Sequence, residues 1–208
     1  MQSLLIDIDG VLYVGDEAIA GAAEAIGWLD AQRVPYLYVT NTTSRPRSDI
    51  VSKLANLGFN TTVERILTPP VAASSWLQGQ GCRRVALFVP TATAAEFSRF
   101  EVIDADDVDV DAVVVGDLGE DWNFATLNRA FRYLMRNPQP ALVALGMTRY
   151  WRAPDGLRLD TAPFVMALAH AAAAEPVVLG KPAADFFRAA LEMLATPAAA
   201  TLMIGCLL

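Results

Sequence analysis

Apolar and polar positions form short blocks along this chain that predict strands and helices in turn. The first apolar block, Leu4–Ile6, runs into Asp7-Ile8-Asp9-Gly10, which is the pattern of a buried strand that ends in a tight turn. Apolar residues at helical spacing then predict a helix over Ala18–Gln32, and the β-rich run Pro35–Val39 predicts a second strand. This order is β-α-β, the unit of a parallel sheet with a right-handed crossover.

The same alternation continues to the end of the chain. Further helices are predicted over Arg47–Leu57, from Thr68-Pro69-Pro70 to about Gln78, and over Thr93–Arg99, Phe124–Arg136, Ala162–Ala173 and Ala183–Leu194. Further strands are predicted at Ile66-Leu67, Arg84–Val89, Glu101–Ile103, Ala112–Val115, Ala141–Leu145, Tyr150–Arg152 (with a turn at Pro154-Asp155-Gly156), Pro176–Pro182 and Thr201–Gly205. Gly79-Gln80-Gly81 has the composition of a hinge, after which the pattern begins afresh. We therefore expect an α/β protein with a core of residues 1–80 and 176–208 and a second α/β domain of residues 81–175 inserted into it.

Composition narrows the class of protein. The 208 residues suffice for one large domain or two small ones, and 54% hydrophobic with 19% charged residues is a globular balance. The net charge of -7 excludes a basic footprint for nucleic acid. An anionic protein that handles anionic substrates would need a local cation to offset the repulsion.

The number of cysteines and the lengths of the apolar stretches indicate the cellular compartment of the protein. Cys82 and Cys206 are too few for a disulfide framework, which favours a thiol-reducing compartment. The first residues lack a basic segment followed by an apolar one, so no signal peptide is expected. Charges or prolines interrupt every apolar stretch before ~20 residues, so no membrane partner is expected either. These features predict a cytoplasmic protein.

Three groups of polar residues follow apolar strands or turns. Asp7 and Asp9 end the first strand, and the second strand ends in Thr40-Asn41-Thr42-Thr43-Ser44-Arg45. Lys181, one of two lysines in the chain, follows a short apolar run and lies in a Gly-Lys-Pro turn. The carboxyl ends of parallel strands meet in the crevice where open α/β sheets bind ligands, so we expect these residues to converge.

The residue types of these groups suit phosphoryl transfer. A carboxylate can act as the nucleophile, hydroxyl and amide groups can hold phosphoryl oxygens, and a lysine is a compact point charge for phosphate. Two of these groups also have a simpler explanation. Asp7 and Asp9 could form a solvated turn, and Thr40–Ser44 could serve as an ordinary helix N-terminus. For the second group both interpretations can hold, because a helix N-terminus is itself an anion site.

Asp7-Ile8-Asp9-Gly10-Val11-Leu12, Thr40-Asn41 and Gly180-Lys181-Pro182 resemble, in this order, the first three motifs of the haloacid dehalogenase-like phosphatases. The long insert between the second and third motifs resembles subfamily IIA, which has a large α/β cap. Two stretches, Gly116–Met135 and Ala144–Lys181, are most similar to the phospholysine phosphohistidine inorganic pyrophosphate phosphatase group. The resemblance implies a Rossmann-like parallel-sheet core of residues 1–80 and 176–208 with an inserted α/β cap of residues 81–175.

The resemblance also implies roles. Asp7 would be the nucleophile and a Mg²⁺ ligand, and Asp9 would be the general acid and base, with its backbone carbonyl on the metal. Thr40, the amides of Asn41 and Thr42, and Lys181 would bind the phosphoryl oxygens. The substrate would be a small phosphorylated molecule: a phosphate ester, a phosphoamino acid or pyrophosphate. Arg152, beside Tyr150 and Trp151, is a candidate for an anionic group of the substrate, and the cap could form a homodimer.

One feature departs from the family pattern. In the family, the strand that matches Thr201–Ile204 runs into Gly-Asp-Asp, whereas here Gly205 is followed by Cys206-Leu207-Leu208. We therefore expect a C-terminally truncated core that lacks the usual acidic pair. The alternative to the enzyme is a weakly active or inactive fragment that serves as a folding or association module.

Overall fold

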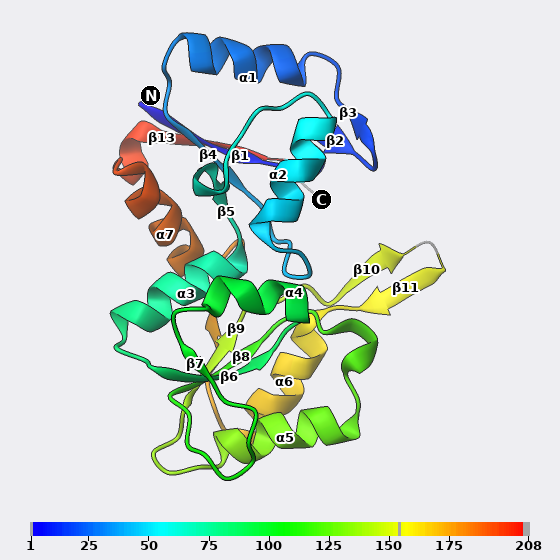
Figure 1. Cartoon of the computed structure of the whole chain (residues 1–208), viewed down its shortest axis with the longest axis vertical. Coiled ribbons are helices and arrows are strands. Elements are labelled where there is room, and N and C mark those ends of the chain that lie inside the picture. Colours follow the sequence, from blue (N-terminus) through cyan, green and yellow to red (C-terminus); the bar gives the residue numbers. More distant parts are fainter. Residues whose placement is uncertain (1, 154, 206–208) are drawn as a thin grey trace.

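The structure is a computed structural model that describes residues 2–153 and 155–205. The turn predicted at Pro154 and the residues after Gly205, including Cys206, lie outside the described part. Within it the chain forms two parallel sheets, one in each half of the molecule, with helices around and between them (Figure 1). This confirms the predicted α/β class. No helix in residues 2–153 and 155–205 is long and apolar enough to cross a membrane.

The first sheet has the strand order β13 (Thr201–Ile204), β1 (Ser3–Asp7), β4 (Tyr36–Val39) and β5 (Ile66–Leu67). All its pairs are parallel. Successive side chains of a strand point to opposite faces of a sheet. Leu4 and Ile6 accordingly pack with α1 (Ala22–Ala31) and α2 (Arg47–Asn56), whereas Leu5 belongs to the cluster that contains α3 (Pro69–Gly79) and α7 (Ala184–Leu194).

The second sheet has the order β12 (Val177–Val178), β9 (Ala141–Ala144), β8 (Ala112–Val115), β6 (Arg84–Phe88) and β7 (Glu101–Val102), again parallel. One face packs on α5 (Phe124–Leu134) and α6 (Thr161–Ala172). Residues of the other face, such as Val85 and Val114, lie in the same cluster as Leu77 of α3 and Phe186 of α7. α3 and α7 therefore form a layer that both sheets share.

The strand β12 lies in a different sheet from the one expected for it. The strand at Val177–Val178 was assigned to the core, but it pairs with Val143 and Ala144 of β9 in the second sheet. Two valines carry no periodicity that would tell one parallel sheet from the other. The chain returns to the first sheet only after this strand, through α7 and β13. The division into two domains stays a prediction.

Three further segments differ from the expected elements. The helix expected from Ala18 begins at Ala22, because a hairpin of β2 (Tyr13–Val14) and β3 (Glu17–Ala18) precedes it. The helix expected over Thr93–Arg99 is shorter, with α4 at Thr91–Ala94 followed by a one-turn helix, η2, at Ala95–Phe97. The strand expected at Tyr150–Arg152 has an antiparallel partner that was not expected, so that β10 (Tyr150–Ala153) pairs with β11 (Gly156–Leu159). The other one-turn helices are η1 (Val63–Arg65), η3 (Gly119–Asp121) and η4 (Ala198–Ala200).

Candidate active site at the ends of β1 and β4

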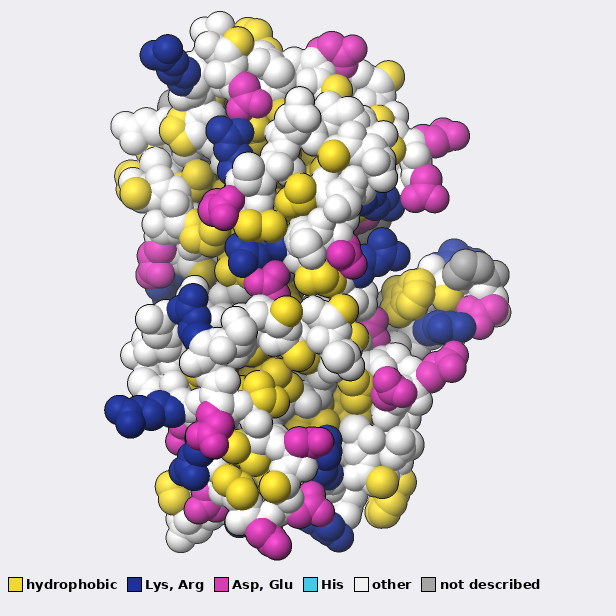
Figure 2. Space-filling view, viewed as in Figure 1, with side chains coloured by type: hydrophobic (Ala, Val, Ile, Leu, Met, Phe, Trp, Pro, Cys, Tyr) yellow, Lys and Arg dark blue, Asp and Glu magenta, His cyan; other side chains and the backbone are white. Residues whose placement is uncertain are grey.

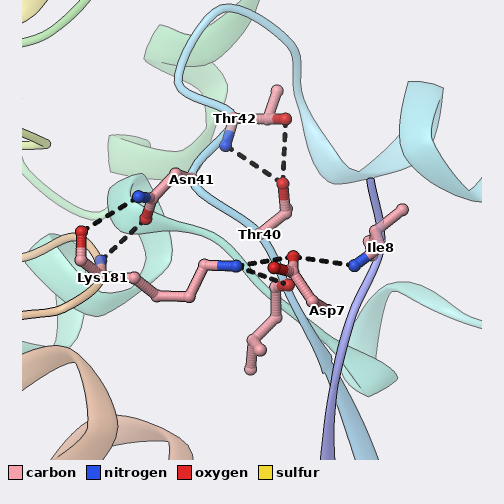
Figure 3. A network of polar contacts seen from close by, with 7 residues as sticks. Asp7, Ile8, Thr40, Asn41, Thr42 and Lys181 are labelled. Carbon is pink, nitrogen blue, oxygen red and sulfur yellow. Dashed lines mark hydrogen bonds and ion pairs between the residues drawn. The ribbon is translucent and has the colours of Figure 1, made fainter. Parts of the chain in front are cut away.

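Asp7 is the last residue of β1, and its side chain is largely enclosed, with 17% of it exposed. The backbone N–H of Ile8 donates to Asp7 Oδ1 at 2.9 Å, which orients the carboxylate (Figure 3). The chain then turns sharply, and Gly10 adopts φ of 77°, a left-handed conformation that glycine takes without strain. This turn leaves Asp9 exposed on the same side as the β2–β3 hairpin.

The β2–β3 hairpin lies next to Asp9 and is held there by contacts of Tyr13 and Lys53. Burial and the neighbouring Asp9 carboxylate raise the pKa of the Tyr13 hydroxyl above its usual range. Lys53 of α2 lies over the Tyr13 ring at 4.2 Å, donates to the Gly15 carbonyl at 2.8 Å, and pairs with Asp16 at 3.2 Å. One lysine thus ties the hairpin to α2.

Lys181 brings a positive charge to the end of β1. Its Nζ lies 2.6 Å from Asp7 Oδ1, and 15% of its side chain is exposed. The same ammonium donates to the carbonyl of Val39, the last residue of β4, at 3.5 Å. Water is largely excluded from this pair, so the attraction is screened less than at the surface. An ammonium in this position matches the expectation of a local cation in an acidic protein that handles anions.

Asn41 holds the turn that carries Lys181. Its side-chain Oδ1 accepts from the Lys181 N–H at 2.7 Å, and its Nδ2 donates to the Lys181 carbonyl at 3.0 Å (Figure 3). The Asn41 side chain is therefore already engaged in fixing the lysine turn. The sequence contains no signal for this pairing, because the two residues lie 140 positions apart.

Thr40 is buried at the end of β4, and Thr42 lies beside it. The two hydroxyl oxygens are 3.0 Å apart, and the Thr42 N–H donates to Thr40 Oγ1 at 3.2 Å. The expected phosphate-binding groups are thus collected at one point, where the Thr42 amide is directed at the Thr40 hydroxyl. A phosphoryl oxygen could take the place of that hydroxyl as acceptor.

Gly180 cannot carry a side chain without moving this site. A Cβ there would lie 2.6 Å from the Leu145 carbonyl oxygen and 3.3 Å from Asn41 Oδ1. We expect Gly180→Ala to shift the Lys181 turn, lowering activity on the order of 10²-fold for a displacement of about 1 Å. Phosphatase assays and thermal unfolding check this, with Gly146→Ala as the matched control, because a Cβ at Gly146 meets no atom within 4 Å. Equal activity of the two variants would contradict the prediction.

The donors near Asp7 partly match a Mg²⁺ site. Asp7 offers a carboxylate and Asp9 a backbone carbonyl, which are the oxygen ligands that Mg²⁺ prefers. The end of β13 also reaches this point, since a Cβ at Gly205 would lie 3.8 Å from Asp7 Oδ2. In residues 2–153 and 155–205 there is no group of three or more His, Cys, Asp or Glu residues that could hold a metal. In the described part, Mg²⁺ would therefore have to take its remaining ligands from water and from substrate oxygens.

Arg152 is not brought into this cluster. It is exposed on β10, and within the described ranges no hydrogen bond or ion pair joins it to Asp7, Thr40 or Lys181. The β10–β11 hairpin stands out from the body of the molecule with apolar side chains on its surface (Figure 2). Its neighbours Tyr150, Trp151, Leu157 and Leu159 are all exposed.

Comparisons with known proteins agree with the motifs. Residues 4–102 match the family model described as haloacid dehalogenase-like hydrolase. The human phospholysine phosphohistidine inorganic pyrophosphate phosphatase is 34% identical over 99% of this chain and 75% of its own length.

Solved structures share the fold. A p-nitrophenyl phosphatase from Archaeoglobus fulgidus aligns with a TM-score of 0.87 at 25% identity, over 96% of this chain and 76% of its own. A glycerol phosphate phosphatase from Mycobacterium tuberculosis, solved in complex with calcium, has a TM-score of 0.85 at 28% identity, over 100% of this chain and 60% of its own. The family predicted from the three motifs is thereby confirmed: this chain belongs to the haloacid dehalogenase-like hydrolases.

Proposed function

We propose that this protein is a Mg²⁺-dependent phosphatase that acts through a phosphoryl group held on Asp7. The observation that carries the proposal is the 2.6 Å ion pair between Asp7 and Lys181 at the carboxyl end of β1. Thr40 and Thr42 lie at the end of the adjacent strand β4. A carboxylate, an ammonium and hydroxyl groups from three separate segments thus lie at the carboxyl ends of two neighbouring strands.

The first half of the reaction transfers the phosphoryl group to the protein. An oxygen of Asp7 attacks phosphorus, and the bond from phosphorus to the leaving oxygen or nitrogen breaks. Asp9 donates a proton to that leaving atom, and its exposed position next to the hairpin lets it reach a bound substrate. Lys181 and the Thr40 hydroxyl stabilise the charge that develops on the phosphoryl oxygens.

The second half releases phosphate. Asp9, now ionised, takes a proton from a water molecule, and the resulting hydroxide attacks phosphorus. The bond between phosphorus and the Asp7 oxygen breaks, so that inorganic phosphate leaves and Asp7 regains its carboxylate. Mg²⁺ bound by the Asp7 carboxylate and the Asp9 carbonyl would offset the repulsion between Asp7 and the phosphate. The calcium in the Mycobacterium tuberculosis relative supports a divalent cation in this family.

The relatives favour a small phosphorylated substrate. The names of the matched proteins cover phosphoamino acids, pyrophosphate, glycerol phosphate and p-nitrophenyl phosphate. We propose that one such class is the substrate and that exposed Arg152 contacts an anionic group distant from the transferred phosphoryl.

A substrate panel tests the proposal. We expect hydrolysis of p-nitrophenyl phosphate, and of at least one of phospholysine, phosphohistidine and pyrophosphate, that needs added Mg²⁺ and is lost on chelation. Acid-quenched protein should carry a phosphoryl group on the peptide that contains Asp7. A folded protein without turnover at any Mg²⁺ concentration, or turnover that chelation leaves unchanged, would contradict it.

A further inference from the structure

The loop that follows Thr40–Thr42 is held by residues of the second half of the molecule. The hydroxyl of Thr93, on α4, donates to the carbonyl of Thr43 at 2.8 Å, and both residues are buried. The backbone N–H of Asp117, after β8, lies 3.4 Å from Thr43 Oγ1 as its donor. Figure 1 shows the loop between β4 and α2 reaching the region of α4. The loop is thus anchored at Thr43 by two different segments.

A second anchor follows where the loop enters α2. Glu96 of η2 accepts from the Arg47 N–H and from Nε, both at 3.1 Å, and its other oxygen accepts from Nη2 at 2.9 Å. Only 12% of the Glu96 side chain and 23% of the Arg47 side chain are exposed. Arg47 Nη1 also donates to the Val63 carbonyl at 2.9 Å. A bidentate, charge-assisted pair of this kind is stronger and more directional than a neutral hydrogen bond.

Together these contacts fix both ends of one short segment. Thr40, Asn41 and Thr42 are held from the first sheet and the Lys181 turn. Thr43 is held by Thr93 and Arg47 by Glu96. Thr93 and Glu96 are separated by two residues, Ala94 and Ala95, and lie on the consecutive short helices α4 and η2. We call the contacts of Thr93 and Glu96 with this loop the brace.

We propose that Thr93 and Glu96 are positioning residues for the phosphoryl site, acting through the Thr40–Arg47 loop. This inference rests on the proposed phosphatase function. A loop that must offer its hydroxyl and N–H groups in one geometry binds phosphate better when it is ordered beforehand. If α4 moves away from the loop, the brace breaks and the loop loses that order. Phosphate affinity is therefore coupled to the position of α4 and η2.

The matched variants are Thr93→Val and Glu96→Gln. Thr93→Val keeps the shape of the side chain and removes the donor, while Glu96→Gln replaces a carboxylate oxygen with an amide that faces the donors of Arg47. The controls are Thr91→Val, exposed on the same helix, and Glu101→Gln, exposed on β7. Thr93→Ser keeps the hydroxyl and should behave as the wild-type protein.

Three measurements decide the inference. Hydrogen exchange of the amides of residues 40–47, without substrate, should become faster by about tenfold in Thr93→Val and Glu96→Gln, while the amides of β8 stay protected. The dissociation constant of inorganic phosphate and the KM for p-nitrophenyl phosphate should rise by about tenfold, which corresponds to one lost hydrogen bond of ordinary strength. A role in overall stability alone would instead lower kcat through the folded fraction and leave KM unchanged.

The inference is overturned if exchange of residues 40–47 matches that of the control variants, or if it speeds up without any change in phosphate affinity. Failure of the proposed function has a different signature. In that case the wild-type protein itself lacks turnover, and the exchange and phosphate-binding data still decide the role of the brace.

Discussion

Asp7→Asn is expected to abolish turnover, with a loss of at least on the order of 10⁴-fold in kcat, because an amide oxygen is a poor nucleophile at phosphorus. The substitution preserves shape, and the Ile8 N–H still finds an oxygen acceptor at this position. The measurement is steady-state hydrolysis of p-nitrophenyl phosphate with added Mg²⁺, together with a search for phosphorylated peptide after acid quenching.

The matched control is Asp107→Asn, on an exposed loop after β7. It makes the same chemical change away from the site and should keep wild-type kcat. Circular dichroism and thermal unfolding establish that the Asp7→Asn protein is folded. Retention of most of the activity by folded Asp7→Asn would refute the assignment of Asp7 as nucleophile.

Lys181→Met should lower kcat/KM by about 10²–10³-fold, the range seen when one group that stabilises transition-state charge is removed. The methionine keeps the unbranched apolar stem up to Cε but not the ammonium that lies 2.6 Å from Asp7. The free energy of unfolding should fall as well, because an enclosed carboxylate loses its counter-charge. Lys181→Arg should not restore full activity, since a planar guanidinium cannot replace a compact ammonium in this turn.

A double variant separates the effect of Lys181→Met on stability from its effect on activity. The double variant Asp7→Asn, Lys181→Met has no uncompensated carboxylate, so it should unfold at a higher temperature than Lys181→Met alone. Arg188→Met, an exposed position on α7, is the control for loss of a positive charge. A Lys181→Met protein as active as this control would remove Lys181 from the site.

The local sequence pattern is sufficient to predict β1, the turn after it and β4, which carry Asp7 and Thr40. Leu4–Ile6 followed by Asp7-Ile8-Asp9-Gly10 predicts a buried strand and a tight turn, because apolar runs and a glycine at a left-handed position are properties of neighbouring residues. The ends of β1 and β4 converge as expected, since parallel neighbouring strands place their carboxyl ends at one edge. The β2–β3 hairpin was missed because two-residue strands carry almost no periodic signal.

Long-range packing decided the rest. The resemblance assigns the backbone amide of Asn41 to phosphate, which stays a prediction, and the structure adds a second role, because the Asn41 side chain holds the Lys181 turn. The requirement for glycine at 180 comes from the carbonyl of Leu145, which follows β9 and is distant in the chain. The placement of β12 in the second sheet likewise depends on which strand edge is available after the helices have packed.

The amino-acid sequence by itself therefore determines the three polar groups of the site and predicts the strands that carry them. Each of these features depends on residues that are neighbours in the chain. Neighbouring residues do not determine the order of strands in the second sheet, the α3–α7 layer shared by both sheets, or the contacts of Thr93 and Glu96 with the Thr40–Arg47 loop. These last features join residues tens of positions apart, and a contact at that separation forms only when the whole chain has packed and the entropy of closing the intervening loops has been overcome.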